Sequence, residues 1–138
     1  MNELFVMSLK AKHRSDGTIR EYTKAIDNCL AYINKPESEI KPIDLELWQS
    51  SMSNLSSASV AQRTSAVREY FKFLYRNEFI SRNPAEMLET PQIKNREQSA
   101  LNGEQVRAMV NAATNERNKA IIMMLAQTGL RIHELANI

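Results

Sequence analysis

Residues 58–76 read Ala-Ser-Val-Ala-Gln-Arg-Thr-Ser-Ala-Val-Arg-Glu-Tyr-Phe-Lys-Phe-Leu-Tyr-Arg, and this stretch decides the fold. Its apolar side chains recur at three- and four-residue spacing, which predicts an amphipathic α-helix. The expected buried face consists of Val60, Thr64, Val67, Tyr70, Phe71 and Leu74. Polar residues crowd the first two turns, and a basic stripe of Arg68, Lys72 and Arg76 lies well away from the apolar face. Such a stripe usually only solvates a helix, but Ser, Gln and Arg also bind phosphates and read base edges.

Three more helices are expected upstream of this stretch. The first covers residues 3–12, and the second begins after a cap at Ser15 or Asp16 and ends before Pro36. The third begins at Pro42, which suits a first helical turn. The apolar faces of the second and third helices are expected to be Ile19, Tyr22, Ile26, Leu30 and Ile33, and Leu45, Trp48 and Met52.

Downstream, Asn83 is expected to cap a short helix with Pro84 at its first position and with Met87 and Leu88 packing back on the bundle. Residues 91–100 are polar, aperiodic and bounded by proline, which indicates a linker. A capping box at residues 102–105 then begins another helix. A further helix, almost continuously apolar from 120 to 126, is expected to end at Gly129.

The composition favours an all-α protein of one domain, or of one domain plus part of another. The chain has 138 residues, 43% apolar and 25% charged, with only three glycines and four prolines. No window approaches the roughly 18 apolar residues of a membrane span, so a cytoplasmic protein is expected. The single cysteine, Cys29, lies in an apolar stripe and is expected in the core. The net charge of +2 is too small to indicate a polyanionic partner by itself. Any such partner must be inferred from where the charges lie along the chain.

Arg131 follows Thr128-Gly129-Leu130 and is itself followed by Glu134. An arginine at a helix start, with a glutamate one turn later, presents a fork of N–H donors to an anion. The alternative is an ordinary solvated pair, which contributes about 0.2–0.5 kcal/mol.

The order of these features resembles the tyrosine recombinase, or phage integrase, family. The resemblance is carried by Tyr-Phe-x-Phe-Leu-Tyr at 70–75, Asn-Pro at 83–84, the basic linker and Leu-Asn-x-Glu-Gln-Val at 101–106. The most specific part is Thr-Gly-Leu-Arg-Ile-His-Glu-Leu at 128–135. The resemblance implies an all-α fold: a four- to five-helix, SAM-like core-binding bundle in residues 1–90, a linker in 91–100, and the first helices of a truncated catalytic domain in 101–138.

The same resemblance implies the chemistry. Arg131 is expected to be the first of two arginines that hold the scissile phosphate, with Glu134 orienting it. In the family a tyrosine forms a 3′-phosphotyrosine link and a 5′-hydroxyl later reseals the strand, so no metal or other cofactor is expected. The remaining family residues are expected beyond Ile138, and the four tyrosines present all lie in the bundle. The chain is therefore expected to be inactive alone.

Duplex DNA is the expected partner, as the family implies. The residues expected to bind it are Lys12, Arg14, Thr18, Arg20, Lys24, Ser59, Gln62, Arg63, Lys72, Lys94 and Arg96. Self-association is also expected: the family implies a tetramer on DNA for the full-length parent, and the exposed apolar surface of residues 119–138 favours a dimer or swapped oligomer. The alternative hypothesis is that the chain is a helical adaptor that binds proteins and has no role on DNA.

Overall fold

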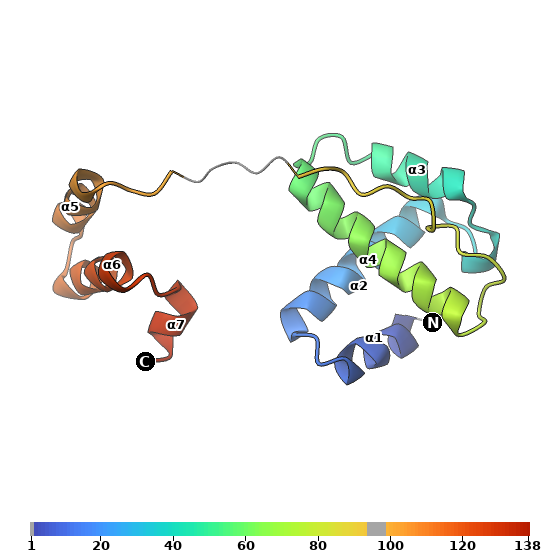
Figure 1. Ribbon diagram of the computed structural model, residues 1–138, viewed down its shortest axis with the longest axis horizontal. Helices are drawn as coiled ribbons and strands as arrows, with labels where there is room; N and C mark the ends of the chain where they lie inside the picture. The colour runs from blue at the N-terminus through green and yellow to red at the C-terminus, as the bar shows by residue number, and fades with distance from the viewer. Residues whose placement is uncertain (1, 94–98) are drawn as a thin grey trace. The chain divides into compact units, whose positions relative to one another are not determined.

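The all-α prediction is confirmed by the computed structural model, which describes residues 2–93 and 99–138. Contacts divide the chain into two compact units, Met1–Asn95 and Arg96–Ile138. The helices of the first unit are α1 (Asn2–Ala11), α2 (Asp16–Ile33), the short 3-10 helix η1 (Glu37–Glu39), α3 (Pro42–Ser50) and α4 (Ser57–Arg76) (Figure 1). Those of the second unit are α5 (Gly103–Ala112), α6 (Glu116–Thr128) and α7 (Ile132–Ala136).

Helix α4 is the central element of the first unit. All six residues of the predicted apolar face are buried, and they pack with α1, α2 and α3 in one hydrophobic core. The ring of Tyr70 contacts the rings of Phe5 and Phe71 edge-on, at centroid distances of 5.3 and 5.6 Å. The bundle forms because each helix has one apolar face and can remove it from water only against the others.

The capping residues define the ends of α2. Ser15 is the N-cap, and its hydroxyl oxygen accepts a hydrogen bond from the Thr18 backbone N–H. Asn34 ends the helix in the left-handed conformation, with φ of 50°. The segment between Pro36 and Pro42 contains η1, and Glu37 of η1 accepts a hydrogen bond from the buried Tyr70 hydroxyl at 3.1 Å. That bond explains why the turn is ordered, since a buried hydroxyl needs a partner.

Trp48 is the core anchor that the sequence predicts. Its side chain is fully buried, and its indole N–H donates to the Asn28 side-chain oxygen at 3.1 Å. Leu45 and Met52 are buried beside it on the same face of α3.

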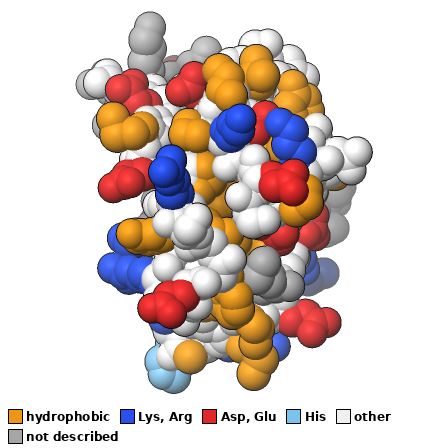
Figure 2. All heavy atoms as spheres, turned by 90° about the vertical axis from the view of Figure 1, so that its right-hand side faces the viewer, with side chains coloured by type: hydrophobic (Ala, Val, Ile, Leu, Met, Phe, Trp, Pro, Cys, Tyr) orange, Lys and Arg blue, Asp and Glu red, His pale blue; other side chains and the backbone are white. Residues whose placement is uncertain are grey.

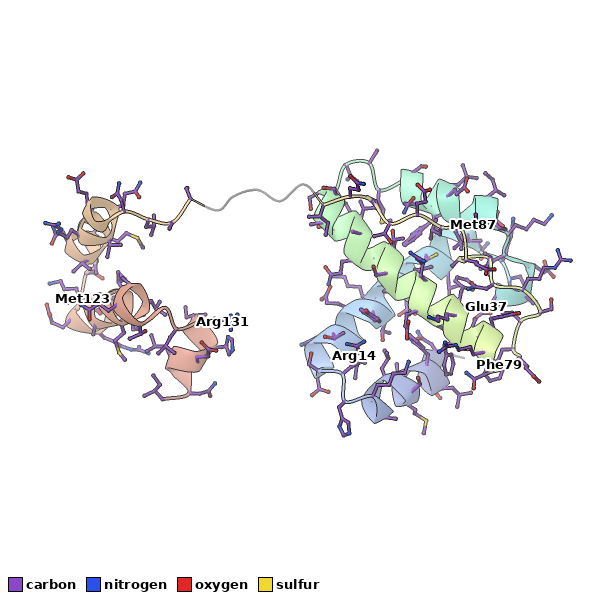
Figure 3. The ribbon with its side chains drawn as sticks, in the orientation of Figure 1. Arg14, Glu37, Phe79, Met87, Met123 and Arg131 are labelled. Carbon is purple, nitrogen blue, oxygen red and sulfur yellow. The ribbon has the colours of Figure 1, made fainter. Side chains whose placement is uncertain are left out.

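The prediction of a short helix beginning at Asn83 is wrong. Residues 84–87 form turns, in which the Asn83 side-chain oxygen accepts from the Ala85 backbone N–H at 3.0 Å. Leu88 packs into the core as predicted, whereas Met87 is 81% exposed (Figure 3). A segment of a few residues between Pro84 and Pro91 gains too few helical hydrogen bonds to offset the cost of nucleation.

The second unit has the predicted helix ends. Asn102 and Gln105 form the capping box through two hydrogen bonds of 2.9 Å, and Gly129 adopts the left-handed conformation with φ of 68°. Among residues 99–138 none is fully buried, and Met123 and Met124 are exposed. Although residues 120–126 are almost continuously apolar, α6 is therefore not buried on several sides within this unit. Within the described residues, no helix is both long enough and apolar enough to cross a membrane.

Cys29 lies in the core, and burial raises the pKa of its thiol to about 12 because the thiolate would lose its hydration. We expect a thiol reagent at pH 8 to label Cys29 only when the bundle unfolds. Since the unfolded thiol ionises near pH ~8.5, the bundle should also lose stability as the pH rises from about 9 towards 12. Labelling rates with and without urea test the first expectation, and immediate labelling of the native chain would contradict it.

Candidate nucleic-acid interface

A polar recess lies between α2 and the N-terminal half of α4. Lys24 of α2 and Ser59, Gln62 and Arg63 of α4 line it, around a cavity of about 120 Å³, together with Glu21. Five further sequence-predicted residues in the described part of the first unit lie elsewhere, but these four, from two segments 35 residues or more apart in sequence, are brought together. The recess thus groups two cations with hydroxyl and amide groups at one place.

Local hydrogen bonds position the α4 side of the recess. Ser56 caps α4 by accepting from the Ser59 backbone N–H at 3.2 Å, and the two serine hydroxyls are 3.0 Å apart. Arg63 is half-buried, and its Nη1 lies 3.9 Å from the sulfur of Met52. The guanidinium of Arg63 is therefore held against Met52 of the bundle at the edge of the recess.

The start of α2 carries a second group of predicted residues. Thr18 is half-buried, and its hydroxyl lies 2.9 Å from that of the capping Ser15. Arg20 is exposed on the first turns of α2, and Arg14 lies in the turn before the helix (Figure 3). These cations extend the charged surface from the recess along α2.

Lys12 forms an ion pair within the bundle. Its ammonium group lies 3.0 Å from a carboxylate oxygen of Glu69 on α4, and both side chains are substantially exposed. Sequence reasoning missed this ion pair because 57 residues separate the two partners. An anion that approaches Lys12 therefore also meets the negative charge of Glu69.

A groove along the C-terminal half of α4 contains the basic stripe. Arg68, Lys72 and Arg76 line it, with Asn83 and Glu86 on the opposite wall and a volume of about 530 Å³. The predicted residue Lys72 therefore lies on another part of α4 than Ser59, Gln62 and Arg63. Lys94 and Arg96, also predicted to contact DNA, lie outside the described residues.

Charge in the first unit is balanced overall. Residues 1–93 contain twelve Lys or Arg and twelve Asp or Glu. On the face shown in Figure 2, acidic and basic side chains alternate around a band of apolar side chains. Attraction for a polyanion must therefore come from local groups of cations such as the recess and the groove.

Arg131 is the N-cap of α7, and its side chain is 77% exposed (Figure 3). Glu134 accepts a hydrogen bond from the Arg131 backbone N–H at 2.7 Å, and its other oxygen is 3.5 Å from the Arg131 guanidinium. The backbone bond is the shorter, so the carboxylate mainly caps α7 and holds the guanidinium more loosely. The arrangement leaves most of the N–H donors of Arg131 directed to solvent.

Residues 3–78 match the family model for the phage integrase N-terminal SAM-like domain. The chain is 28% identical to tyrosine recombinase XerA of Saccharolobus solfataricus, over 97% of this chain and 48% of that protein. It is 27% identical to tyrosine recombinase XerC of Bacillus pumilus, over 98% of this chain and 48% of that protein. The chain thus spans about half the length of the curated relatives it matches.

Solved structures agree with these matches. The crystal structure of XerA recombinase covers 99% of this chain at 28% identity, with a TM-score of 0.53, and this chain covers 48% of it. The integrase from mycobacterium phage Brujita covers the whole chain at 21% identity, with a TM-score of 0.65, and likewise has 48% of its length covered. The second likeness concerns the fold alone.

Proposed function

The chain belongs to the phage integrase family of tyrosine recombinases, and on that premise we propose that its first unit binds duplex DNA through α2 and α4. The full-length parent would then be a site-specific recombinase that cleaves and rejoins strands through a 3′-phosphotyrosine. This chain would supply part of the parent's DNA-binding surface.

The observation that carries the proposal is the grouping of Lys24, Ser59, Gln62 and Arg63 around one recess between two helices. Arginine bonds to guanine and glutamine to adenine in the major groove, while lysine and serine contact phosphates. Arg63 is held in place by the bundle, which reduces the entropy lost when it binds. We assign Gln62 and Arg63 to base edges, and Ser59 and Lys24 to the backbone.

The remaining predicted residues are assigned to the phosphates on either side. Arg14, Thr18 and Arg20 extend the surface at the start of α2, and Lys72 extends it along α4. Lys12 would join them by leaving Glu69. Lys94 and Arg96 would follow the DNA backbone between the two units.

For the second unit we propose that Arg131 holds a phosphate and that Glu134 restrains it. A planar fork of donors suits a phosphoryl group whose non-bridging oxygens gain negative charge in the transition state. The exposure of the Arg131 guanidinium supports this assignment, since its donors are accessible to an anion.

A fluorescence anisotropy titration of the chain with a labelled duplex, at two salt concentrations, tests the proposal. We expect a Kd of about 10⁻⁴–10⁻⁶ M at physiological salt on arbitrary sequence, and a much tighter complex at low salt. An affinity for the duplex that does not change with salt concentration would contradict the electrostatic assignment. If the chain does not bind duplex DNA at low salt but retains a protein partner, the hypothesis of a helical adaptor that binds proteins is favoured.

The Lys12–Glu69 pair leads to a further prediction. Glu69→Gln should strengthen duplex binding by roughly 0.5–1 kcal/mol, about two- to fivefold, because it releases Lys12 and removes a repelling charge. Folding stability should change by less than about 0.5 kcal/mol, since the pair is exposed. Glu46→Gln on α3 makes the same charge change elsewhere and is the control. Equal gains in both variants would show that only net charge matters.

Self-association through residues 119–138 is a separate proposal. Exposed apolar side chains of the second unit, among them Met123, Met124 and Ile132, support it. Light scattering over a range of concentrations should detect a dimer or larger species, and a monomer at high concentration would contradict it.

A further inference from the structure

After α4 the chain reverses direction and runs back along that helix. We call residues 80–91 the return segment. In Figure 1 its trace starts near the C-terminal end of α4 and reaches the N-terminal end before residue 94. Ile80, Ala85 and Leu88 attach the segment to the hydrophobic core of the first unit.

Gln49 of α3 joins the end of the return segment to the bundle. Its side-chain nitrogen donates to the backbone carbonyl oxygen of Glu89 at 2.8 Å and to the hydroxyl oxygen of Thr64 at 3.0 Å. Thr64 is fully buried on α4, so one amide group connects α3, α4 and the return segment. The Glu89 carbonyl can only accept, which determines that the nitrogen of Gln49 faces it.

A second side chain holds the next residue. Nη1 of Arg68 on α4 donates to the hydroxyl of Thr90 at 3.3 Å. This bond accounts for Arg68 without assigning it to DNA. Gln49 provides the shorter attachment, and beyond Thr90 the chain continues towards the second unit.

The return segment changes the point at which the chain leaves the bundle. A 20-residue helix such as α4 is about 30 Å long. Without the segment the chain would leave at Asn77, at the C-terminal end of α4. With it, the chain leaves beyond Thr90, on the half of α4 that carries Ser59, Gln62 and Arg63.

We propose that Gln49 is a positioning residue that fixes where the second unit is tethered, close to the DNA-binding part of α4. This inference rests on the proposed function for its DNA component. With Glu89 and Thr90 held, 11 residues, 91–101, separate Thr90 from the Asn102 cap, whereas without these contacts 13 residues, 89–101, follow the core residue Leu88. Effective concentration falls roughly as the −3/2 power of tether length, so loss of the contact should weaken two-unit binding by less than about twofold.

Two substitutions of Gln49 test the anchor, because both remove the donor with little change of size. In Gln49→Met and Gln49→Glu, NMR order parameters of Glu89 and Thr90 should fall from about 0.85 to below about 0.6. Ile26→Val, a small core deletion on α2, is the control for lost stability and should leave them unchanged. Unchanged order parameters in the Gln49 variants would overturn the proposal.

Distances between spin labels test the positioning. Labels at Ala31→Cys on α2 and Asn111→Cys on α5 use exposed sites, and buried Cys29 should remain unlabelled. The distance distribution should widen in both Gln49 variants and not in Ile26→Val. Anisotropy titration with a duplex should give weaker binding, by less than about twofold, for the Gln49 variants alone.

The outcomes separate this inference from the proposed function. If the order parameters fall but the distances and DNA affinity match those of Ile26→Val, Gln49 orders the segment without positioning the second unit, and the inference is wrong. If the wild-type chain does not bind duplex at low salt, the proposed function and the DNA component fail together. The order parameters and distances, measured without DNA, still decide whether Gln49 anchors the tether.

Discussion

The double variant Lys24→Ala/Arg63→Ala is expected to lose most of the affinity of the chain for duplex DNA. Both cations line the recess between α2 and α4. Each lost phosphate contact should reduce the slope of log K against log salt by about 0.9, and loss of an arginine at a base edge costs about 1–3 kcal/mol on a specific site. Anisotropy titrations at several salt concentrations measure both effects.

A matched control distinguishes the recess from net charge. Lys41→Ala/Arg82→Ala removes the same two charges from a different pocket of the first unit, formed by η1, the start of α3 and the return segment. This control should change duplex affinity little and leave the salt slope intact. If it weakens binding as much as the recess variant does, the recess is not the DNA-binding surface.

Trp48→Ala is expected to destabilise the first unit by about 3–5 kcal/mol, a large part of the stability of a small domain. The side chain is fully buried, and its removal leaves a cavity and an Asn28 oxygen without its donor. Urea unfolding followed by circular dichroism is the measurement, because the chain contains one tryptophan and the variant loses its fluorescence.

Trp48→Phe separates the two contributions to that loss. It retains a six-membered ring and removes the five-membered ring with its N–H donor, so it should cost clearly less, about 1–2 kcal/mol. A cost below about 1 kcal/mol for Trp48→Ala would show that the core does not depend on this residue.

The helices and their ends could be predicted from the sequence because they depend on neighbours within a few residues. The spacing of Val60, Val67 and Leu74 determined the buried face of α4, and the Asn102–Gln105 capping box and Gly129 determined the ends of helices in the second unit. The error at Asn83 concerned a segment too short for local signals to decide. The functional interpretation came from motif resemblance, since charge and composition alone left a protein-binding adaptor open.

By itself, then, the sequence determined helical periodicity, caps and the family motif around Arg131, all of which are local patterns. The tertiary structure alone decided which distant side chains meet: Lys24 with Arg63 in the recess, Lys12 with Glu69, and Gln49 with Glu89 across 40 residues. Hydrogen bonds and ion pairs between such residues leave no periodic signal in the sequence. They form only after burial of the apolar faces has brought the helices together.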